Sequence, residues 1–427
     1  MKTTEICFPY GKEKIKHEFN NDELLGVLTS KIEEYTPEKS ENELIKEALE
    51  NPIASKKLCE LAKGKNKVVV IASDHTRPVP SKLIIPQMLR EIRKGNPDAD
   101  ITILIATGCH RGTTKEELVV KFGESIVKNE KIYVHDCDET EKLINIGTLP
   151  SGGECNINSI ATEADLLVAE GFIEPHFFAG FSGGRKSVLP GIAGRTTVLA
   201  NHCSEFIANE NARTGILENN PIHEDMLWAA KKTKLTFIVN VVLNAEKKVI
   251  YAVAGDTECA HKKGTDFMLT LCGAKAIEAD IAISTNGGYP LDQNVYQAVK
   301  GMTAAEATVK KDGVIIMLAK SNDGIGGEHF YHQLADEEDI SKTMELFLKR
   351  TRNETVPDQW QTQIMLRILM RSTVIYISEM ADDIVKKMHM VPAKSVEEAI
   401  CKAKKILNKE NATIVAIPDG VSIMVTR

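Results

Sequence analysis

Short runs of apolar, mostly β-branched residues alternate with segments of helical spacing through the first 270 residues. The runs predict strands at 67–72, 101–106, 132–134, 165–169 and 236–242, and the segments between them include helices at 83–93 and 115–122. Such alternation is typical of a largely parallel sheet whose faces are covered by helices.

The same pattern restarts after about residue 275. It predicts strands at 280–284, 314–319 and 374–377 and helices at 295–299, 341–348, 360–370 and 396–407. We therefore predict an α/β protein with two domains, 1–270 and 276–408, each a largely parallel sheet flanked by helices. The last apolar run, 413–417, leaves an alternative open, because segment 411–427 fits either domain.

Composition limits the class of protein. The chain has 427 residues, and at about 150 residues per domain this is two or three domains. Its 53 Lys and Arg against 60 Asp and Glu give a net charge of −7, which argues against a nucleic-acid or anionic-membrane partner. No apolar run approaches the roughly 20 residues of a membrane helix. Residues 1–5 lack the apolar core of a signal peptide, so we expect a cytoplasmic protein.

Three unusual polar stretches each follow a predicted strand directly. They are 73–78, 107–114 and 174–187. In open α/β sheets, ligands bind beyond the carboxyl ends of the strands. We therefore expect these stretches to converge on one cleft.

The stretch 180–187 nearly matches the phosphate-binding pattern GxxxxGK[ST], but Arg185 stands where the pattern requires its last glycine. This difference argues against an ATPase. Gly183 and Gly184 still allow backbone N–H groups to face an anion, and Arg185 and Lys186 add positive charge. The stretch therefore predicts a phosphate-bearing ligand; the alternative is a tight turn in which the glycines only accommodate packing.

Imidazoles and cations follow the same strands. His110, His176 and His202 are the candidate histidines, although each alone is more often structural, and their spacing is too long for a local zinc motif. Arg77 is a candidate for gripping a carboxylate, because guanidinium offers two parallel donors, and Asp74 is placed to orient it. The alternative for Arg77 is a surface ion pair.

The second domain has its own candidate stretch, 286–302, which again follows a strand. On its helix, Tyr296 and Lys300 share one face, and Gln293 and Gln297 form a similar pair. The alternative is a solvated amphipathic helix. Trp360 is one of two tryptophans and by itself is more often a core residue.

Together these motifs resemble the nickel-dependent lactate racemase family. The resemblance rests on 74–78, 108–111, 174–176, 180–186, 201–202 and 293–300, and it runs through nearly the whole chain. It implies a two-domain α/β fold with the active site in the interdomain cleft. It also implies interconversion of D- and L-lactate by hydride transfer to and from a nickel-pincer nucleotide, a pyridinium-3-thioamide-5-thiocarboxylic acid mononucleotide that holds Ni(II).

The resemblance further implies a role for each candidate residue. Lys186 tethers the nucleotide, His202 completes the nickel coordination, and His110 and His176 are the acid–base pair. The other candidates are Asp74, Gly183, Gly184 and Arg185 for the cofactor, and Arg77, Tyr296, Gln297, Lys300 and Trp360 for the substrate. The implied partners are a small 2-hydroxy acid and, transiently, the enzymes that make the cofactor.

Two other functions remain open at this point. One is a racemase or epimerase of another 2-hydroxy acid such as malate, which an additional cation near the substrate methyl group would favour. The other is a phosphate- or nucleotide-binding protein without catalysis. Such a protein would keep Gly183 and Gly184 but would have no need of the three histidines together.

Overall fold

The computed structural model describes residues 2–426, which form two compact units. The N-terminal unit comprises 32–202 and 209–270, and the C-terminal unit comprises 2–31, 203–208 and 271–426. The expected class, two largely parallel sheets flanked by helices, is confirmed. The division along the chain differs from the linear one expected at about residue 270, because residues 2–31 and 203–208 belong to the C-terminal unit.

A six-stranded sheet forms the centre of the N-terminal unit. In spatial order its strands are β13 (Val249–Gly255), β12 (Leu235–Leu243), β9 (Leu166–Phe172), β4 (Lys67–Ser73), β5 (Asp100–Ala106) and β6 (Lys131–Val134). All neighbours are parallel except β12 and β13. The five expected strands are confirmed. The edge strand β13 is not predicted by strand–helix alternation, because alternation indicates parallel neighbours only.

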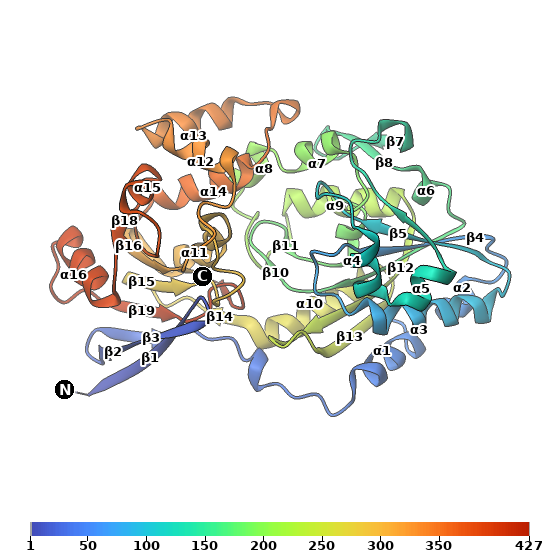
Figure 1. Cartoon of the computed structure of the whole chain (residues 1–427), viewed down its shortest axis with the longest axis horizontal. Coiled ribbons are helices and arrows are strands. Elements are labelled where there is room, and N and C mark those ends of the chain that lie inside the picture. The colour runs from blue at the N-terminus through green and yellow to red at the C-terminus, as the bar shows by residue number, and fades with distance from the viewer. Residues whose placement is uncertain (1, 427) are drawn as a thin grey trace. The chain divides into compact units, whose positions relative to one another are not determined.

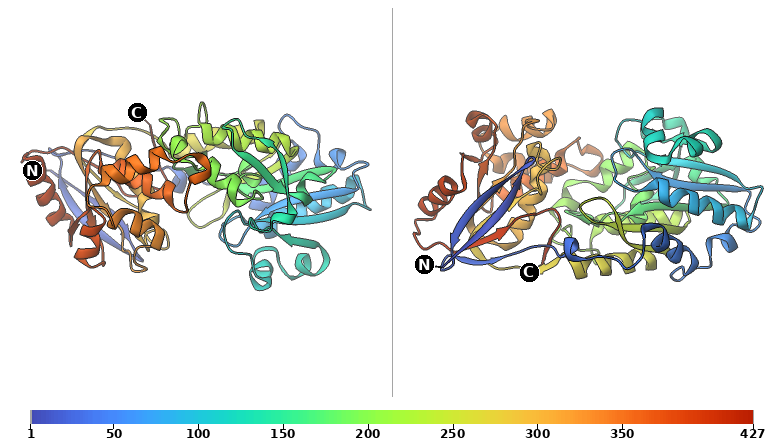
Figure 2. Two further views of the ribbon diagram at one scale, coloured as in Figure 1. Left: turned by 90° about the horizontal axis from the view of Figure 1, so that it is seen from above. Right: turned by 60° about the horizontal axis from the view of Figure 1, so that its bottom comes forward.

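Helices cover this sheet because its central strands are buried along their length. One face packs against α1 (Glu41–Glu50), α3 (Ser81–Gly95) and α4 (Lys115–Phe122), so the expected helices at 83–93 and 115–122 are confirmed. Val70, Ile45 and Met88 belong to the core on this face. Figures 1 and 2 show α1 and α3 side by side along it.

The C-terminal unit has its own six-stranded sheet, in which all neighbours are parallel. In spatial order its strands are β18 (Val391–Ala393), β17 (Thr373–Ile377), β16 (Val309–Leu318), β15 (Ala279–Thr285), β19 (Ile414–Ile417) and β3 (Leu24–Val27). One face packs against α16 (Val396–Leu407) and against the hairpin of β1 (Thr3–Tyr10) and β2 (Glu13–Asn20), which Figure 2 shows lying along the sheet. The other face carries α11 (Val295–Thr308), where the Ser284 hydroxyl donates to the Gly301 carbonyl at 2.9 Å.

Both ends of the described chain belong to the C-terminal unit. β3 pairs with β19, which explains why residues 2–31 belong here, and β19 pairs with β15. β20 (Met424–Thr426) pairs with β14 (Gly273–Lys275). The final segment therefore continues the C-terminal unit instead of returning to the N-terminal one. The sequence does not predict this pairing, because the apolar run at 24–27 is short and is interrupted by Gly26.

The remaining elements are mostly short. The strands are β7 (Leu143–Thr148), β8 (Glu154–Asn158), β10 (Pro175–His176) and β11 (Gly180–Phe181). The helices are α2 (Leu58–Leu61), α5 (Glu124–Asn129), α6 (Ser159–Thr162), α7 (Arg195–Asn201), α8 (Ser204–Ala208), α9 (Pro221–Lys232), α10 (Cys259–Cys272), α12 (Glu328–Ala335), α13 (Ile340–Lys349), α14 (Gln359–Leu369), α15 (Asp382–Lys387) and the 3₁₀ turn η3 (Gly184–Ser187). Within residues 2–426, no helix has the length and apolar character needed to cross a membrane.

Candidate active site

Three candidate loops leave neighbouring strands of the N-terminal sheet. β9, β4 and β5 are adjacent and parallel, and Ser73 pairs with Ala106 at their carboxyl ends. The loop after β4 carries Asp74, the loop after β5 carries His110, and the loop after β9 carries His176. The topology therefore brings the three polar stretches to one edge of the sheet, as expected.

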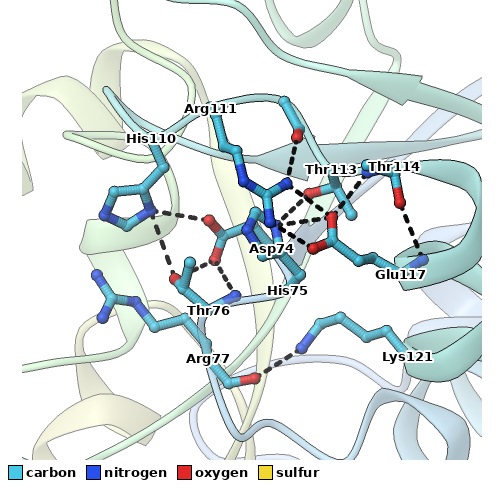
Figure 3. Close-up of polar contacts among 11 residues, drawn as sticks. Asp74, His75, Thr76, Arg77, His110, Arg111, Thr113, Thr114, Glu117 and Lys121 are labelled. Atoms are coloured by element: carbon cyan, nitrogen blue, oxygen red, sulfur yellow. Dashed lines mark hydrogen bonds and ion pairs between the residues drawn. The ribbon is translucent and has the colours of Figure 1, made fainter.

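Asp74 holds His110 (Figure 3). The Asp74 carboxylate accepts a hydrogen bond from His110 Nδ1 at 2.8 Å, and it accepts two more from Thr76, from the hydroxyl at 2.7 Å and the backbone N–H at 3.2 Å. Burial by itself would raise the pKa of Asp74. The hydrogen bonds from His110 and Thr76 lower it more strongly, so the pKa lies below its usual value and Asp74 is ionised at neutral pH.

This bond fixes the state of the His110 ring. With its Nδ1 proton donated to a carboxylate, the neutral ring carries its lone pair on Nε2. The Asp74 side chain is 1% exposed, whereas that of His110 is 43% exposed. The pair therefore consists of a buried anion and an accessible base, which is an arrangement suited to accepting a proton and stabilising the imidazolium that results.

The arginines near this pair have different partners. Arg111 binds Glu117 through both ends of its guanidinium, with N–O distances of 2.9 and 2.5 Å, so its charge is used in a local ion pair. Arg77 is exposed, and Figure 3 shows its side chain extending to the side on which His110 lies. Its backbone carbonyl accepts a hydrogen bond from Lys121 at 3.0 Å. Arg77 therefore remains the candidate for an anionic substrate.

Phe178 brings three further candidates together. Its ring centroid lies 4.5 Å from that of His176 and 5.1 Å from that of His202, both edge-on. The ammonium of Lys186 lies 6.0 Å from the same centroid. The candidate tether, nickel ligand and second acid–base residue thus surround one buried aromatic ring.

His202 follows α7 and is buried. Its Nδ1 donates to the carbonyl oxygen of Val198 at 2.9 Å, which places the lone pair of the neutral ring on Nε2. Burial, and then the positive charge of Lys186, lower the pKa of His202 to about 4. The ring is therefore neutral at physiological pH, as a metal-binding imidazole must be.

His176 is held in the opposite way from His110. The backbone N–H of Ala179 donates to His176 Nδ1 at 3.3 Å, so the neutral ring carries its proton on Nε2. Phe177 stacks on the imidazole with centroids 5.2 Å apart. The ring is therefore oriented by the chain that immediately follows it.

The glycine-rich turn is organised by packing with the protein interior. Gly183 and Gly184 have φ angles of +79° and +54°, and a Cβ on them would lie 2.7 Å from Asn240 Oδ1 and 2.9 Å from a ring carbon of His261. The Gly184 N–H donates to Asn240 Oδ1 at 2.8 Å. The packing alternative thus accounts for both glycines, and their contact with a phosphate stays a prediction.

The sequence predicts that the charge of Arg185 faces a phosphate, but the structure places this side chain in the interior of the unit. Its side chain is 1% exposed and its guanidinium donates to the carbonyls of Ala179 at 2.7 Å and Phe181 at 2.8 Å. It also bonds His261 at 3.2 Å. These contacts place its charge inside the unit.

Phe178, Asn240 and His261 organise this site but were not candidates in the sequence. Asn240 has the clearest signal in the sequence, because it is a polar residue that interrupts the apolar run 237–243 of β12. The aromatic pair after His176 is a weaker signal. His261 has none, since it lies in an ordinary amphipathic helix.

The other candidates belong to the C-terminal unit. The Tyr296 hydroxyl donates to the Asp358 carboxylate at 3.2 Å and is also hydrogen-bonded to Trp360. Burial, and to a smaller extent the negative charge of Asp358, raises the pKa of Tyr296. The backbone N–H of Gln297 donates to Asn294, the N-cap residue of α11, and Lys300 lies one turn further along that helix. The structure therefore brings Tyr296 and Trp360 together within this unit.

Two family models match the chain. The lactate racemase N-terminal domain matches residues 10–215, and the lactate racemase C-terminal domain matches residues 274–425. The chain belongs to the lactate racemase family. It is therefore an enzyme of the isomerase class.

Family relatives cover nearly the whole chain. The lactate racemase of Thermoanaerobacterium thermosaccharolyticum is 54% identical over 421 residues, which are 98% of this chain and 99% of the relative. The lactate racemase of Lactiplantibacillus plantarum is 53% identical over 421 residues, with the same coverage of both chains.

Solved structures confirm the fold. The lactate racemase apoprotein of T. thermosaccharolyticum matches with a TM-score of 0.95 at 53% identity, covering 99% of this chain and all of that one. A Thermotoga maritima protein matches with a TM-score of 0.63 at 19% identity, covering 92% of this chain and 99% of that one. The second likeness extends to the fold alone.

Proposed function

We propose that this enzyme interconverts D- and L-lactate by removing the C2 hydrogen with its electron pair while an imidazole takes the hydroxyl proton. Identities of 54% and 53% to the lactate racemases of two other organisms support the substrate. The observation that carries the chemistry is the 2.8 Å bond between Asp74 and His110, which presents an accessible base supported by a buried anion.

The N-terminal unit has donors that suit a nickel-pincer nucleotide. Lys186 has a primary amine for a covalent tether, and the buried, neutral imidazole of His202 is a nitrogen donor of the kind Ni(II) accepts. The Nδ1 bond to Val198 orients that ring, as the outer hydrogen bond of a metal-binding histidine ordinarily does. When bound, the group would supply the acceptor and donor for the C2 hydride. Asp74, Gly183 and Gly184 are further proposed contacts of the nucleotide. The buried position of Arg185 argues against a direct contact between its side chain and the nucleotide.

His110 acts as base on one enantiomer. The hydroxyl proton moves to Nε2, the ring becomes an imidazolium, and the ionised Asp74 stabilises that charge through Nδ1. Because the His110 side chain is 43% exposed, the ring exchanges its proton with water between turnovers. The 2-keto acid formed is planar at C2, so return of the hydrogen to its other face gives the opposite enantiomer.

His176 is the corresponding group for the other enantiomer. Its neutral ring carries the proton on Nε2 because Nδ1 accepts from Ala179, so in this state it is a hydrogen-bond donor. Two imidazoles with opposite proton positions suit a substrate whose hydroxyl changes sides. Arg77 is proposed to bind the carboxylate by a bidentate contact. Tyr296, Gln297, Lys300 and Trp360 keep their proposed substrate-binding roles on the family resemblance.

Intact mass of the full chain tests the proposed cofactor. After co-expression with the cofactor-making enzymes, we expect added mass corresponding to a sulfur-containing nucleotide. The addition should be lost in Lys186→Ala and retained in Lys94→Ala, which removes an exposed lysine of the same unit. No added mass, or an addition that persists in Lys186→Ala, contradicts the tether. Assays with lactate and malate on the loaded chain then distinguish the two substrates.

A further inference from the structure

A cavity of about 570 Å³ opens within the N-terminal unit. It is lined by Phe181 and Arg185 from the glycine-rich stretch, by residues of α9 and α10, and by the segment 215–218. None of the residues proposed for proton transfer, the tether or nickel lines it. Its volume lies in the range of about 300–1,000 Å³ typical of small-molecule sites.

Among the described residues that line this cavity, Arg185 is a buried cation and no acid is buried with it. The guanidinium donates to three backbone carbonyls and contacts His261 Nε2, and all of these partners are neutral. Its Nε has no hydrogen-bond partner among residues 2–426. Burial lowers the pKa of Arg185 to about 9, which still leaves it charged at neutral pH. A buried charge is ordinarily paired, so this one lacks its usual complement.

The two histidines of the cavity add to the same imbalance. His223 Nδ1 is buried and has no partner within the described residues. Burial is the main cause that lowers the pKa of His223, and the positive charges of Arg185 and Lys231 lower it further. Burial and the charge of Arg185 also lower the pKa of His261. Both rings are therefore neutral and lie near cations, and Nδ1 of His223 is left without a hydrogen-bond partner among the described residues.

The acids that line the cavity do not correct this imbalance. Glu218, Glu258 and Asp266 are exposed. Glu258 pairs with Lys231 at 2.8 Å, and Asp266 pairs with Lys262 at 2.8 Å. The interior of the cavity is thus positive, whereas its acids lie at the surface.

We propose that this cavity is a second binding site, specific for a small organic carboxylate with an apolar body. The carboxylate would bind at Arg185 Nε and His223, where one negative charge balances the one buried cation. Phe181, Leu227 and Leu269 line the same cavity and would contact the hydrocarbon part. This binding would be separate from the proposed racemisation, in which proton transfer, the tether and nickel are assigned to residues that do not line the cavity.

Calorimetric titration of the full chain, without cofactor, tests the site with hexanoate as the probe. Hexanol has the same chain length and no charge, and serves as the ligand control. We expect hexanoate to bind and hexanol to bind at least about tenfold more weakly, as loss of a charge-assisted contact predicts. Equal affinity for the two probes overturns the anion site, as does absence of hexanoate binding up to about 10 mM.

Two variants locate the binding. Leu269→Trp adds bulk to the cavity wall, and His223→Phe keeps a ring but removes its polar nitrogens. Each should weaken hexanoate binding at least about tenfold. Leu346→Trp, at an exposed leucine of α13 in the C-terminal unit, should leave it unchanged. Thermal unfolding confirms that each variant is folded, and unchanged hexanoate affinity in either cavity variant overturns the proposal.

Discussion

His110 and His202 are both held through Nδ1, but by different acceptors. His110 donates to the carboxylate of Asp74 at 2.8 Å, and His202 donates to the carbonyl of Val198 at 2.9 Å. The first ring is accessible, and the second is buried with its pKa lowered to about 4. An ionised carboxylate stabilises a ring that gains a proton, whereas burial and the nearby charge of Lys186 keep the ring of His202 neutral. Partner charge and burial, more than ring orientation, therefore suit one imidazole to the proposed proton transfer and the other to the proposed metal binding.

Substitution of the two histidines should have the strongest consequences, and it should affect racemisation and nickel binding differently. His110→Asn should reduce racemisation of lactate by at least about 10³-fold while nickel stays bound, because only the base is lost. His202→Asn should release nickel and lose activity with it. Metal analysis and racemisation assays on the two loaded variants give the result. Nickel loss in His110→Asn would contradict the role of His110 as a base alone, and full nickel content in His202→Asn would contradict the role of His202 as a nickel ligand.

A smaller effect is expected when only the partner of His110 changes. Asp74→Asn keeps the shape but removes the charge that stabilises the imidazolium, so we expect kcat to fall roughly 10²-fold. Because Asn can donate to Nδ1, it also favours the wrong proton position on the ring. The pH–rate profile should shift as well as fall. Asp98→Asn, an exposed carboxylate of the same unit, should change neither rate nor profile.

The smallest expected effect concerns stability. The pKa of Asp74 is lower in the folded chain than its ordinary value of about 3.9, so its ionised form stabilises the fold above that pH. This contribution is lost as the pH falls through the folded pKa. At pH 7, Asp74→Asn should therefore unfold at a lower temperature than the native chain, and the difference should shrink below about pH 4. A difference that grows on acidification would contradict the direction of the shift.

Much of the fold follows from local pattern. The strands β4, β5 and β12 have long β-branched runs and β9 begins with a short apolar run, so composition and length predict them well. The pairing of β3 with β19 joins residues almost 400 positions apart, and nothing in a four-residue run specifies such a partner. For the same reason the sequence left the place of the final segment open.

The site shows the same limit. That His110 and Asp74 follow adjacent strands is predictable from topology, but their hydrogen bond is not. Phe178, which touches three candidates, became visible only with side-chain positions. Arg185 is the clearest case: its charge and glycine-rich surroundings suggest a phosphate contact, whereas its four hydrogen-bond partners turn it inward.

The most direct test of the proposed chemistry follows the C2 hydrogen. The loaded chain is supplied with L-lactate deuterated at C2 in ordinary water, and the D-lactate formed is examined by mass spectrometry. If the hydrogen leaves C2 with its electron pair and returns, while histidine exchanges only the hydroxyl proton, the product keeps its deuterium. Replacement of the C2 deuterium by solvent hydrogen would show that a base removes it as a proton, and would contradict the proposed hydride transfer.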